Sequence, residues 1–550
     1  MTIGLATAAA VTAATVAAGP VATAAPAPRT AGTGAAARAT VSKVAWAACD
    51  NPTLQQAGAV CGTVTVPLDY AKPKGATVHL AVSMVRHTVP DSQYQGIMLV
   101  NPGGPGGSGL TLSILGQFVP NGVGNAYDWI GFDPRGVGSS TPALSCIPDY
   151  FAGPRPLYEP FTKKIESAWL ARSKAYAAAC GKHGGALLQH LTTIDSARDM
   201  DAIRAALGQK QINYYGFSYG TYLGQVYATL FPHRVRRAVF DSNVDPRRVW
   251  YAANLDQDVA FERNMKIWFA WLAKYDAVYH LGKTERAVEA RWYAERSRLL
   301  KHPAGGVVGA SEWTDIFLYA GYYQQTWLDL ADLWATWNKD HRNAQPLVDE
   351  YNSANTVGDD NGFAMYLGVQ CVDAPWPRDW NVWRRDNWRT YQRAPFVTWG
   401  NAWFNAPCAF WPAKAHTPVD VDGKRVAPIL LIDETLDAAT PYPGSLEVRR
   451  RFPTSSLLAE PGGTSHADSL FGNACVDDTI AAYLANGTLP VRKPGKGPDA
   501  TCAPLPVPVP PGVSSTSAAS GSGAAAARNG SPGAGRPALL LARLLATSRG

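Results

Sequence analysis

A serine between two glycines lies where the chain is expected to pass from a strand into a helix. The GxSxG pattern covers residues 216–220, with Ser218 at its centre; apolar residues 212–215 precede it, and a helical stretch over residues 221–230 follows. A tight strand-to-helix turn needs small flanking residues and presents the serine hydroxyl at the helix N-terminus. The pattern therefore predicts that Ser218 is the nucleophile of an acyl-transfer reaction.

Such a serine needs a histidine as its base, and in this arrangement the histidine follows both the serine and an acid along the chain. Of the 10 histidines, only His416 and His466 lie beyond residue 395. His466 follows a predicted strand over residues 456–459, whereas His416 stands in a Pro/Lys-rich loop with no strand before it. We therefore predict His466 as the base and interpret His416 as a surface residue.

Three carboxylates that follow another predicted strand compete to orient this base. They are Asp433, Glu434 and Asp437, after residues 429–432. Asp437 is favoured because it lies in a turn a few residues past the strand end, from which a side chain can reach the histidine, and because Thr440 can hydrogen-bond to it. Asp433 and Glu434 remain as alternatives, and their other interpretation is that they end the strand.

The oxyanion of a tetrahedral intermediate needs two hydrogen-bond donors, usually the amide after the nucleophile and one from the loop after the third strand. Tyr219 supplies the first of these. The glycine-rich residues 101–109 directly follow the apolar residues 97–100, and they leave backbone N–H groups open to a substrate. The second donor is expected in this loop. The chemistry requires neither a metal nor a cofactor.

Short apolar runs alternate with helical stretches around these motifs, which is typical of a mostly parallel sheet flanked by helices. Several of the runs end in glycine-rich or acidic turns, where an open α/β sheet places its binding site. The candidate strands are residues 96–100, 129–132, 212–215, 238–240, 429–432 and 456–459.

Residues 247–395 differ, because strand-like runs disappear there and helical patterns rich in Trp and Tyr take over. The plain interpretation is a helical core. A helical cap inserted into the sheet fits better, since the strand pattern resumes at Ile429 and both parts of the sheet must belong together. We therefore predict an α/β fold in which the core segments 43–246 and 396–502 flank this helical cap.

Both ends of the chain differ from this folded part. Residues 1–24 are small and apolar and end in an Ala-x-Ala pattern, which is typical of a signal peptide, and residues 25–42 resemble a linker or propeptide. Residues 503–550, rich in Pro, Ala, Gly and Ser, are predicted to form a disordered tail, because they bury too little apolar surface to offset their ordering entropy. A secreted protein is therefore expected. The last apolar run, residues 538–546, is too short for a membrane span.

The cysteines support export. They form an even set of 8 without a CxxC pair, which argues against metal binding and favours disulfides in an oxidising compartment. Pairing in sequential order closes four short loops and is the best single arrangement. The pairs would be Cys49 with Cys61, Cys146 with Cys180, Cys371 with Cys408, and Cys475 with Cys502.

The charge of the chain excludes one class of partner. A net charge of +7 and a pI near 8.9 are too mild to indicate a nucleic-acid partner. The chain has no dense cluster of Lys and Arg, and we interpret Arg449, Arg450 and Arg451 as a solvent-exposed face.

With these motifs the sequence resembles the secreted bacterial tripeptidyl aminopeptidases, α/β-hydrolases related to proline iminopeptidase. The likeness covers roughly residues 45–502. It rests on residues 101–109, 131–139, 193–201 and 437–441, and on the C-terminal stretch from about residue 395.

The resemblance implies the α/β-hydrolase fold and two groups of site residues. These are a triad of Ser218, Asp437 and His466, and an oxyanion hole made by Gly104 and Tyr219. The chain departs from the family's pattern at residues 464–465, where the family often has glycine nearly before the histidine.

The implied function is a secreted serine exopeptidase that acts on peptide substrates. It would release short peptides, with tripeptides as the expected length, from free N-termini through an acyl-enzyme on Ser218. An exopeptidase also needs an acid that binds the free amine, for which Asp373 is the first candidate and Glu262 the second, although either acid can also be an ordinary surface or capping residue.

Two other classes remain as alternatives. A carboxylesterase or a proline iminopeptidase-like hydrolase would use the same triad, because fold and triad do not define the substrate. A catalytically inactive binding protein is the third class. The presence of serine, base, acid and oxyanion loop together argues against it.

Overall fold

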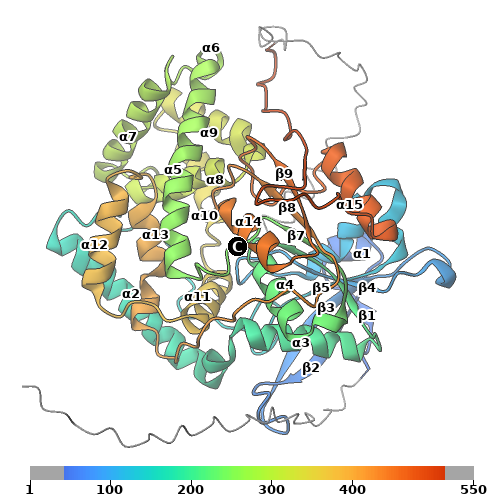
Figure 1. Ribbon diagram of the computed structural model, residues 1–550. Helices are drawn as coiled ribbons and strands as arrows, with labels where there is room; N and C mark the ends of the chain where they lie inside the picture. Colours follow the sequence, from blue (N-terminus) through green and yellow to red (C-terminus); the bar gives the residue numbers. More distant parts are fainter. Residues whose placement is uncertain (1–42, 514–550) are drawn as a thin grey trace, which may run out of the picture. The chain divides into compact units, whose positions relative to one another are not determined.

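The computed structural model describes residues 43–513, which contain one ten-stranded sheet and the helices packed against it (Figure 1). The predicted signal peptide, residues 1–24, and the predicted linker, residues 25–42, lie outside the described residues. So do residues 514–550 of the predicted tail.

The sheet has the strand order β1-β2-β3-β5-β4-β6-β7-β8-β9-β10. The pairs from β1 to β5 in this order are antiparallel, and all pairs from β5 to β10 are parallel. The strands are β1 (Ala47–Ala48), β2 (Val60–Pro67), β3 (Thr77–Val85), β4 (Ile97–Asn101), β5 (Asp128–Phe132), β6 (Ile212–Phe217), β7 (Val235–Asp241), β8 (Leu430–Glu434), β9 (Ser456–Glu460) and β10 (Ala500–Thr501). The six predicted strands are present as β4 to β9, whereas the sequence analysis did not predict β1, β2, β3 and β10.

The central strands are buried on both faces because helices cover each side of the sheet. In β4, Ile97 and Leu99 belong to one buried cluster and Met98 and Val100 to another. The first cluster contains residues of the helices that follow β5 and β6, and the second contains residues of the last helix. Continuous apolar runs are the expected sequence of such doubly covered parallel strands.

The helices fall into those that flank the sheet and those inserted between β7 and β8. The flanking helices are α1 (Pro52–Gln56), α2 (Lys163–Gly184), α3 (Thr193–Ala206), α4 (Tyr219–Leu230), α14 (Pro443–Arg451) and α15 (Ala474–Asn486). The inserted helices are α5 (Tyr251–Lys274), α6 (Asp276–Tyr279), α7 (Glu285–Lys301), α8 (Ala310–Tyr322), α9 (Trp327–Lys339), α10 (Gln345–Ala354), α11 (Asn361–Asp373), α12 (Trp380–Tyr391) and α13 (Thr398–Asn405). Short 3₁₀ helices are η1 (Asp91–Gln93), η2 (Leu110–Phe118), η3 (Pro120–Ala126), η4 (Gly185–His190), η5 (Pro232–Arg234), η6 (Gln324–Thr326) and η7 (Ala406–Phe410).

The inserted helices, which we call the cap, build a core of their own. β7 and β8 nevertheless pair directly, with Val239 opposite Leu430, so the chain returns to the same sheet after the insertion. The last cap helix ends at Asn405, beyond the predicted end of the cap at residue 395. The cap core includes the fully buried side chains of Trp268, Trp292, Trp313 and Trp334.

Four disulfides tie short loops within the described residues. They join Cys49 to Cys61, Cys146 to Cys180, Cys371 to Cys408, and Cys475 to Cys502, which is the sequential pairing. Between residues 43 and 513, no helix combines the length and the apolar composition that a bilayer crossing requires.

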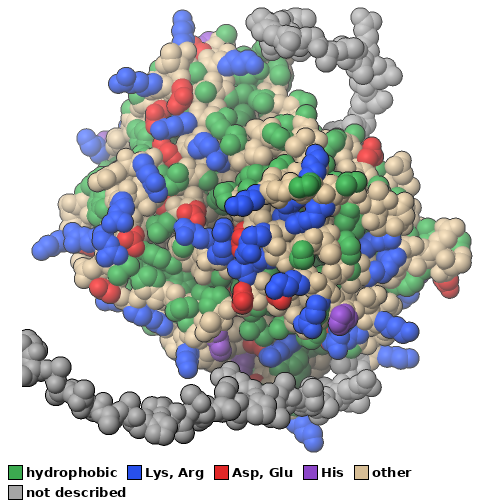
Figure 2. All heavy atoms as spheres, viewed as in Figure 1, with side chains coloured by type: hydrophobic (Ala, Val, Ile, Leu, Met, Phe, Trp, Pro, Cys, Tyr) green, Lys and Arg blue, Asp and Glu red, His purple; other side chains and the backbone are tan. Residues whose placement is uncertain are grey.

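The interpretation of Arg449, Arg450 and Arg451 as one solvent-exposed face is wrong for the first of them. Arg449 is buried and forms an ion pair of 2.6 Å with the buried Asp499. Arg450 and Arg451 pair with Glu447 on the same helix, because residues three and four apart are neighbours on a helix surface. Figure 2 shows basic side chains spread over this face of the molecule and gathered near its middle, with fewer acidic side chains between them.

Residues 503–513, the C-terminal strap, run against the cap instead of leaving the folded part at residue 502. Trp271 Nε1 of α5 donates a hydrogen bond of 2.9 Å to the Pro508 carbonyl, and Gln324 Nε2 donates one of 3.1 Å to the Pro506 carbonyl. Pro510 is buried. The ordered part thus extends past the predicted boundary, because cap side chains satisfy the carbonyls of a segment that has few N–H groups for a ladder of its own.

We expect a chain that ends at residue 503 to be less stable than one that ends at residue 513. The free energy of unfolding should be lower by roughly 1–3 kcal/mol, because two hydrogen bonds and some apolar burial are lost. Guanidinium titration followed by tryptophan fluorescence measures the difference. Trp271→Phe should lower the stability of the longer chain more than that of the shorter one, because only the longer chain also loses the hydrogen bond to Pro508. Equal stabilities of the two chains would contradict a structural role for the strap.

Candidate active site

Ser218 lies in a sharp turn between β6 and α4. Its backbone has φ 57° and ψ −126°, a left-handed conformation that a non-glycine residue holds only when its surroundings enforce it. A Cβ at Gly216 would come within 2.6 Å of the Gly220 carbonyl oxygen, which explains why a side chain is not tolerated there. The predicted strand, turn and helix are therefore all present, and the hydroxyl stands at the N-terminus of α4.

His466 and Asp437 are in direct contact after the last two long strands. Their closest atoms, Nδ1 of His466 and Oδ2 of Asp437, are 2.7 Å apart, and both side chains are buried. The amides of Ala439 and Thr440 donate to Oδ1 of Asp437, and the Thr440 hydroxyl donates to Oδ2 at 2.8 Å. Three donors besides the imidazole thus hold this carboxylate in place.

The contacts of Asp437 also set its charge. Burial alone would raise the pKa of its carboxyl, but the neighbouring His466 and the hydrogen bonds from His466 and Thr440 outweigh burial, so the pKa lies below its ordinary value. The acid therefore remains ionised, which is the state that can orient an imidazole and stabilise its protonated form.

The two alternative acids have other partners. Asp433 accepts the Ser445 hydroxyl at 2.5 Å, and burial together with the charge of Asp437 raises the pKa of Asp433 well above its ordinary value. Glu434 accepts the backbone N–H of Ser465. His416 is exposed. Of the three competing carboxylates, the structure brings Asp437 to the histidine.

Asp241, at the end of β7, joins the serine turn to the histidine loop. Its carbonyl accepts the Ser218 N–H at 3.0 Å, and its carboxylate accepts the N–H and the hydroxyl of Ser469 at 3.1 and 2.5 Å. The next residue, Ser242, accepts the Ala467 N–H at 2.7 Å. The sequence analysis missed this pair, although an acid directly after the predicted strand over residues 238–240 was the available signal.

The cap covers the histidine from the other side. The backbone N–H of His466 donates to the Tyr322 carbonyl at 2.9 Å. The ring centres of Tyr322 and Tyr323 lie 5.9 and 6.4 Å from that of the imidazole. The Ser465 hydroxyl accepts the Gln324 N–H at 3.2 Å. The base is therefore positioned by the sheet and by the cap together.

The glycine-rich loop after β4 packs directly on the serine turn. A Cβ at Gly103 would lie 2.8 Å from the Ser218 Cβ and 3.0 Å from the Tyr219 nitrogen, so this approach requires glycine. The Gly103 N–H is already used, because it donates to the Asn101 side chain at 3.0 Å. The adjacent Gly104 is partly exposed. Its amide and that of Tyr219 remain the predicted oxyanion donors beside this contact.

The two predicted amine-binding acids are engaged elsewhere. Asp373 accepts the N–H and the hydroxyl of Thr193, at 2.7 and 2.5 Å, at the start of α3. Glu262 accepts the Phe396 N–H at 3.0 Å and pairs with Lys266 at 3.1 Å. Each carboxylate satisfies protein donors that would otherwise be left without a partner, which is a structural role that the sequence pattern could not show.

Among residues 43–513, one group of three acids could hold a cation. Glu434, Glu460 and Asp468 are buried, and ligand oxygens from the three side chains lie within 4.8 Å of one another. No step of the acyl-transfer chemistry passes through this group.

Two protein families match the chain. The family described as "alpha/beta hydrolase fold" matches residues 96–356, and the family described as "TAP-like protein" matches residues 394–502. The first match contains Ser218 and extends through much of the insertion, and the second contains both Asp437 and His466.

Three curated relatives cover most of the chain. The tripeptidyl aminopeptidase of Streptomyces lividans is 43% identical over 86% of this chain and 88% of its own length. The serine protease Hip1 of Mycobacterium tuberculosis is 31% identical over 81% and 89%, and the carboxylesterase B of Mycobacterium tuberculosis is 32% identical over 78% and 85%.

The buried carboxyl of Asp373 makes a pH dependence of stability testable. Burial raises its pKa from 3.8 to about 7, so between these values the folded chain holds one proton more than the unfolded chain. Its contribution to stability is therefore lost as the pH rises, by up to about 1.4 kcal/mol per pH unit.

Guanidinium unfolding at pH 5 and pH 7, with the disulfides intact, measures how much unfolding free energy is lost as the pH rises. This loss should be smaller for Asp373→Asn than for the unchanged chain. The comparison between the two proteins removes the contributions of all other buried acids. Identical pH dependences would show that this carboxyl is ionised throughout the range.

Proposed function

The chain belongs to the tripeptidyl aminopeptidase family of α/β-hydrolases, and from this premise we propose that it is a serine exopeptidase that releases short peptides from free N-termini. The family resemblance and the fold class predicted from the sequence are thereby confirmed. The expected length of the released peptide is three residues, by analogy with the name of the Streptomyces relative.

The proposed reaction is acyl transfer through Ser218. His466 removes the proton of the serine hydroxyl, and the serine oxygen attacks the scissile carbonyl to give a tetrahedral intermediate. The amides of Gly104 and Tyr219 stabilise its oxyanion. When the C–N bond breaks, His466 gives the proton to the leaving amine, and a water activated by the same histidine later releases the acyl group and restores the serine.

One observation carries this proposal more than any other. Nδ1 of His466 contacts the ionised Asp437, and the loop that carries His466 is tied through Asp241 to the turn that holds Ser218. A buried acid held by four donors stabilises one tautomer of the imidazole, with the proton on Nδ1. The other nitrogen is then left as the acceptor that a general base needs.

Location and substrate follow from the same premise. Four disulfides suit an oxidising compartment, and together with the predicted signal peptide they support secretion. Peptides are the proposed partners. Ester hydrolysis is the second candidate function, because one relative is named a carboxylesterase, but the relative with the higher identity is named a tripeptidyl aminopeptidase.

A substrate pair tests the function directly. Alanyl-alanyl-alanine p-nitroanilide with a free amine should be cleaved at least about 30-fold faster, in kcat/KM, than its N-acetylated form, because an exopeptidase pocket pairs with the ammonium. Ser218→Ala should abolish both reactions and labelling by a fluorophosphonate. Equal rates on the two peptides, or activity confined to simple esters, would exclude an exopeptidase and leave a serine hydrolase.

The roles of the competing acids are tested by a matched pair of variants. Asp437→Asn should lower kcat by about 10³- to 10⁴-fold, because an amide in its place favours the wrong imidazole tautomer. Asp433→Asn should change kcat far less, since its carboxyl faces Ser445 and not the histidine. Thermal unfolding of both variants controls for misfolding. The reverse ranking would assign the role to Asp433.

A further inference from the structure

The turn that carries Asp437 packs into the cap and not against the sheet alone. Ala438 and Ala439, the two residues after the acid, belong to the buried core of the cap. From α5, the side-chain amide of Gln257 donates a hydrogen bond of 2.6 Å to the Ala439 carbonyl. A turn that follows a strand of the sheet therefore takes part of its surroundings from a helix of the insertion.

Asn264 of α5 binds both loops of the candidate triad. Its side chain is buried, and its Nδ2 donates to the Leu436 carbonyl at 3.0 Å and to the Thr464 carbonyl at 3.2 Å. Leu436 directly precedes Asp437, and Thr464 precedes His466 by two residues. One cap side chain thus contacts the backbone beside the acid and the backbone beside the base.

The same amide also contacts the end of α8. Its Nδ2 donates to the Gly321 carbonyl at 3.1 Å, and the carbonyl of the next residue, Tyr322, accepts the backbone N–H of His466. An NH₂ group has two hydrogens, so the three carbonyls share them in a three-centre arrangement. Asn264 therefore joins α8, the acid turn and the histidine loop at one point.

Arg263 fixes the orientation of this amide. Its Nε donates to Asn264 Oδ1 at 3.0 Å, which turns the amide nitrogen toward the carbonyls. Its Nη2 donates to the carbonyls of Leu436 and Asp437, the second at 3.3 Å. Burial lowers the pKa of Arg263, and the charge of Asp437 opposes this. Because an attraction between two charges acts on both, the guanidinium also favours the ionised form of Asp437.

We infer that Asn264 is a positioning residue of the triad, which holds the acid turn and the histidine loop where Nδ1 of His466 meets Asp437, and that Arg263 holds Asn264 in turn. The inference rests on the proposed acyl transfer through Ser218 and deepens it. The acid and the base lie 29 residues apart in the chain, yet their contact is 2.7 Å long. A misplacement of about 1 Å in such a pair can lower the rate by about 100-fold.

The two loops also contact each other without the cap. The Leu436 N–H donates to the Gly463 carbonyl at 2.9 Å, and Glu434 accepts the Ser465 N–H. These contacts lie within the loops and strand ends themselves, whereas the Asn264 contacts also include α8. Removing Asn264 should therefore leave the loops folded and loosen the position of the imidazole.

The first experiment is a double-mutant cycle on the rate constant of labelling by a fluorophosphonate, which reports the activation of Ser218 on any substrate. Asn264→Ala should lower this rate constant by about 10- to 100-fold. It should lower kcat for alanyl-alanyl-alanine p-nitroanilide by a similar factor and leave KM within a few-fold. In an Asp437→Asn background the same change should lower labelling by at most about 3-fold, because residues that act as a unit are not additive.

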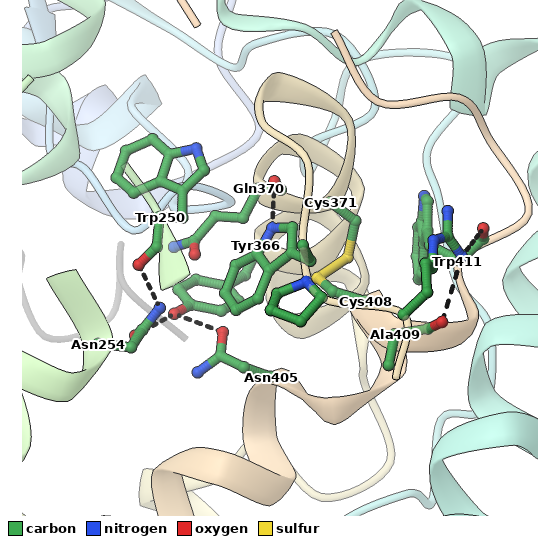
Figure 3. Close-up of a disulfide and its surroundings, with 12 residues drawn as sticks. Trp250, Asn254, Tyr366, Gln370, Cys371, Asn405, Cys408, Ala409 and Trp411 are labelled. Carbon is green, nitrogen blue, oxygen red and sulfur yellow. Dashed lines mark hydrogen bonds between the residues drawn. A yellow bond between two sulfur atoms is a disulfide. The ribbon is translucent and has the colours of Figure 1, made fainter. Parts of the chain in front are cut away.

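A purely structural role predicts another result, namely the same factor in both backgrounds, and that result would overturn the inference. The matched control is Asn254→Ala. Asn254 is a buried asparagine of the same helix, whose amide donates to the Trp250 carbonyl at 3.0 Å and whose oxygen accepts the Tyr366 hydroxyl at 3.4 Å (Figure 3). Its removal should keep labelling within about 3-fold. An equal loss in both variants would show general loosening of α5 and would also overturn the inference.

Arg263→Met keeps the test decisive if Asn264→Ala does not fold. The Arg263 side chain is partly exposed, so an apolar chain of similar length can replace it. This variant should lower labelling by about 3- to 10-fold, and by less in the Asp437→Asn background. Full labelling of Arg263→Met would contradict the inferred role of the pair.

The same measurements separate this inference from the proposed function. If the unchanged chain is labelled but does not cleave the tripeptide anilide, the exopeptidase fails, while the labelling cycle still tests Asn264. If Asp437→Asn is labelled at the full rate, the triad assignment fails and the inference fails with it.

Discussion

The parallel pairing of β7 with β8 is the constraint on which the site depends. Ser218 comes before the cap in the chain, whereas Asp437 and His466 come after it, and the pairing of Val239 with Leu430 returns the chain to the same edge of the sheet. The carboxyl ends of β7 and β8 therefore lie side by side. Asp241, the last residue of β7, makes this proximity specific, because its carbonyl accepts the Ser218 N–H while its carboxylate holds the loop of the histidine.

The buried carboxylates differ in their hydrogen-bond partners, and these partners indicate whether a carboxylate stabilises the fold or belongs to the candidate site. Asp373 and Glu262 each accept a backbone N–H from a distant segment and so connect a cap helix to that segment. Asp437 is satisfied by four donors, one of which is the imidazole, so it remains charged in a buried place.

Much of the core and of the candidate triad could be predicted from the sequence, because the signals are local. The strand before Ser218, the glycines around it and the apolar strand before Asp437 are each visible within a few residues. The hairpin of β2 and β3 was missed since its alternating pattern is weaker than the continuous runs of buried parallel strands.

Partners of charged side chains could not be predicted, because they come from distant parts of the chain. Arg449 looks like one of three surface arginines until Asp499 is found beside it. Asp373 looks like a free acid of the cap until α3 is found against it. The strap likewise has no hydrophobic period of its own, and its order depends on donors from Trp271 and Gln324. Local composition describes a segment in isolation, whereas burial and pairing are properties of the assembled chain.

The sheet and the cap therefore carry different parts of the activity. In the proposed mechanism the strand ends supply a serine, a base and two amides that can act on any activated carbonyl, and relatives named a peptidase and a carboxylesterase agree with this. The choice of substrate must come from what covers these groups. Here the cover has an aromatic core of its own, contacts the base through Tyr322 and is hydrogen-bonded to the strap through Trp271. Differences in such a cover can change the substrate without any change in the catalytic groups.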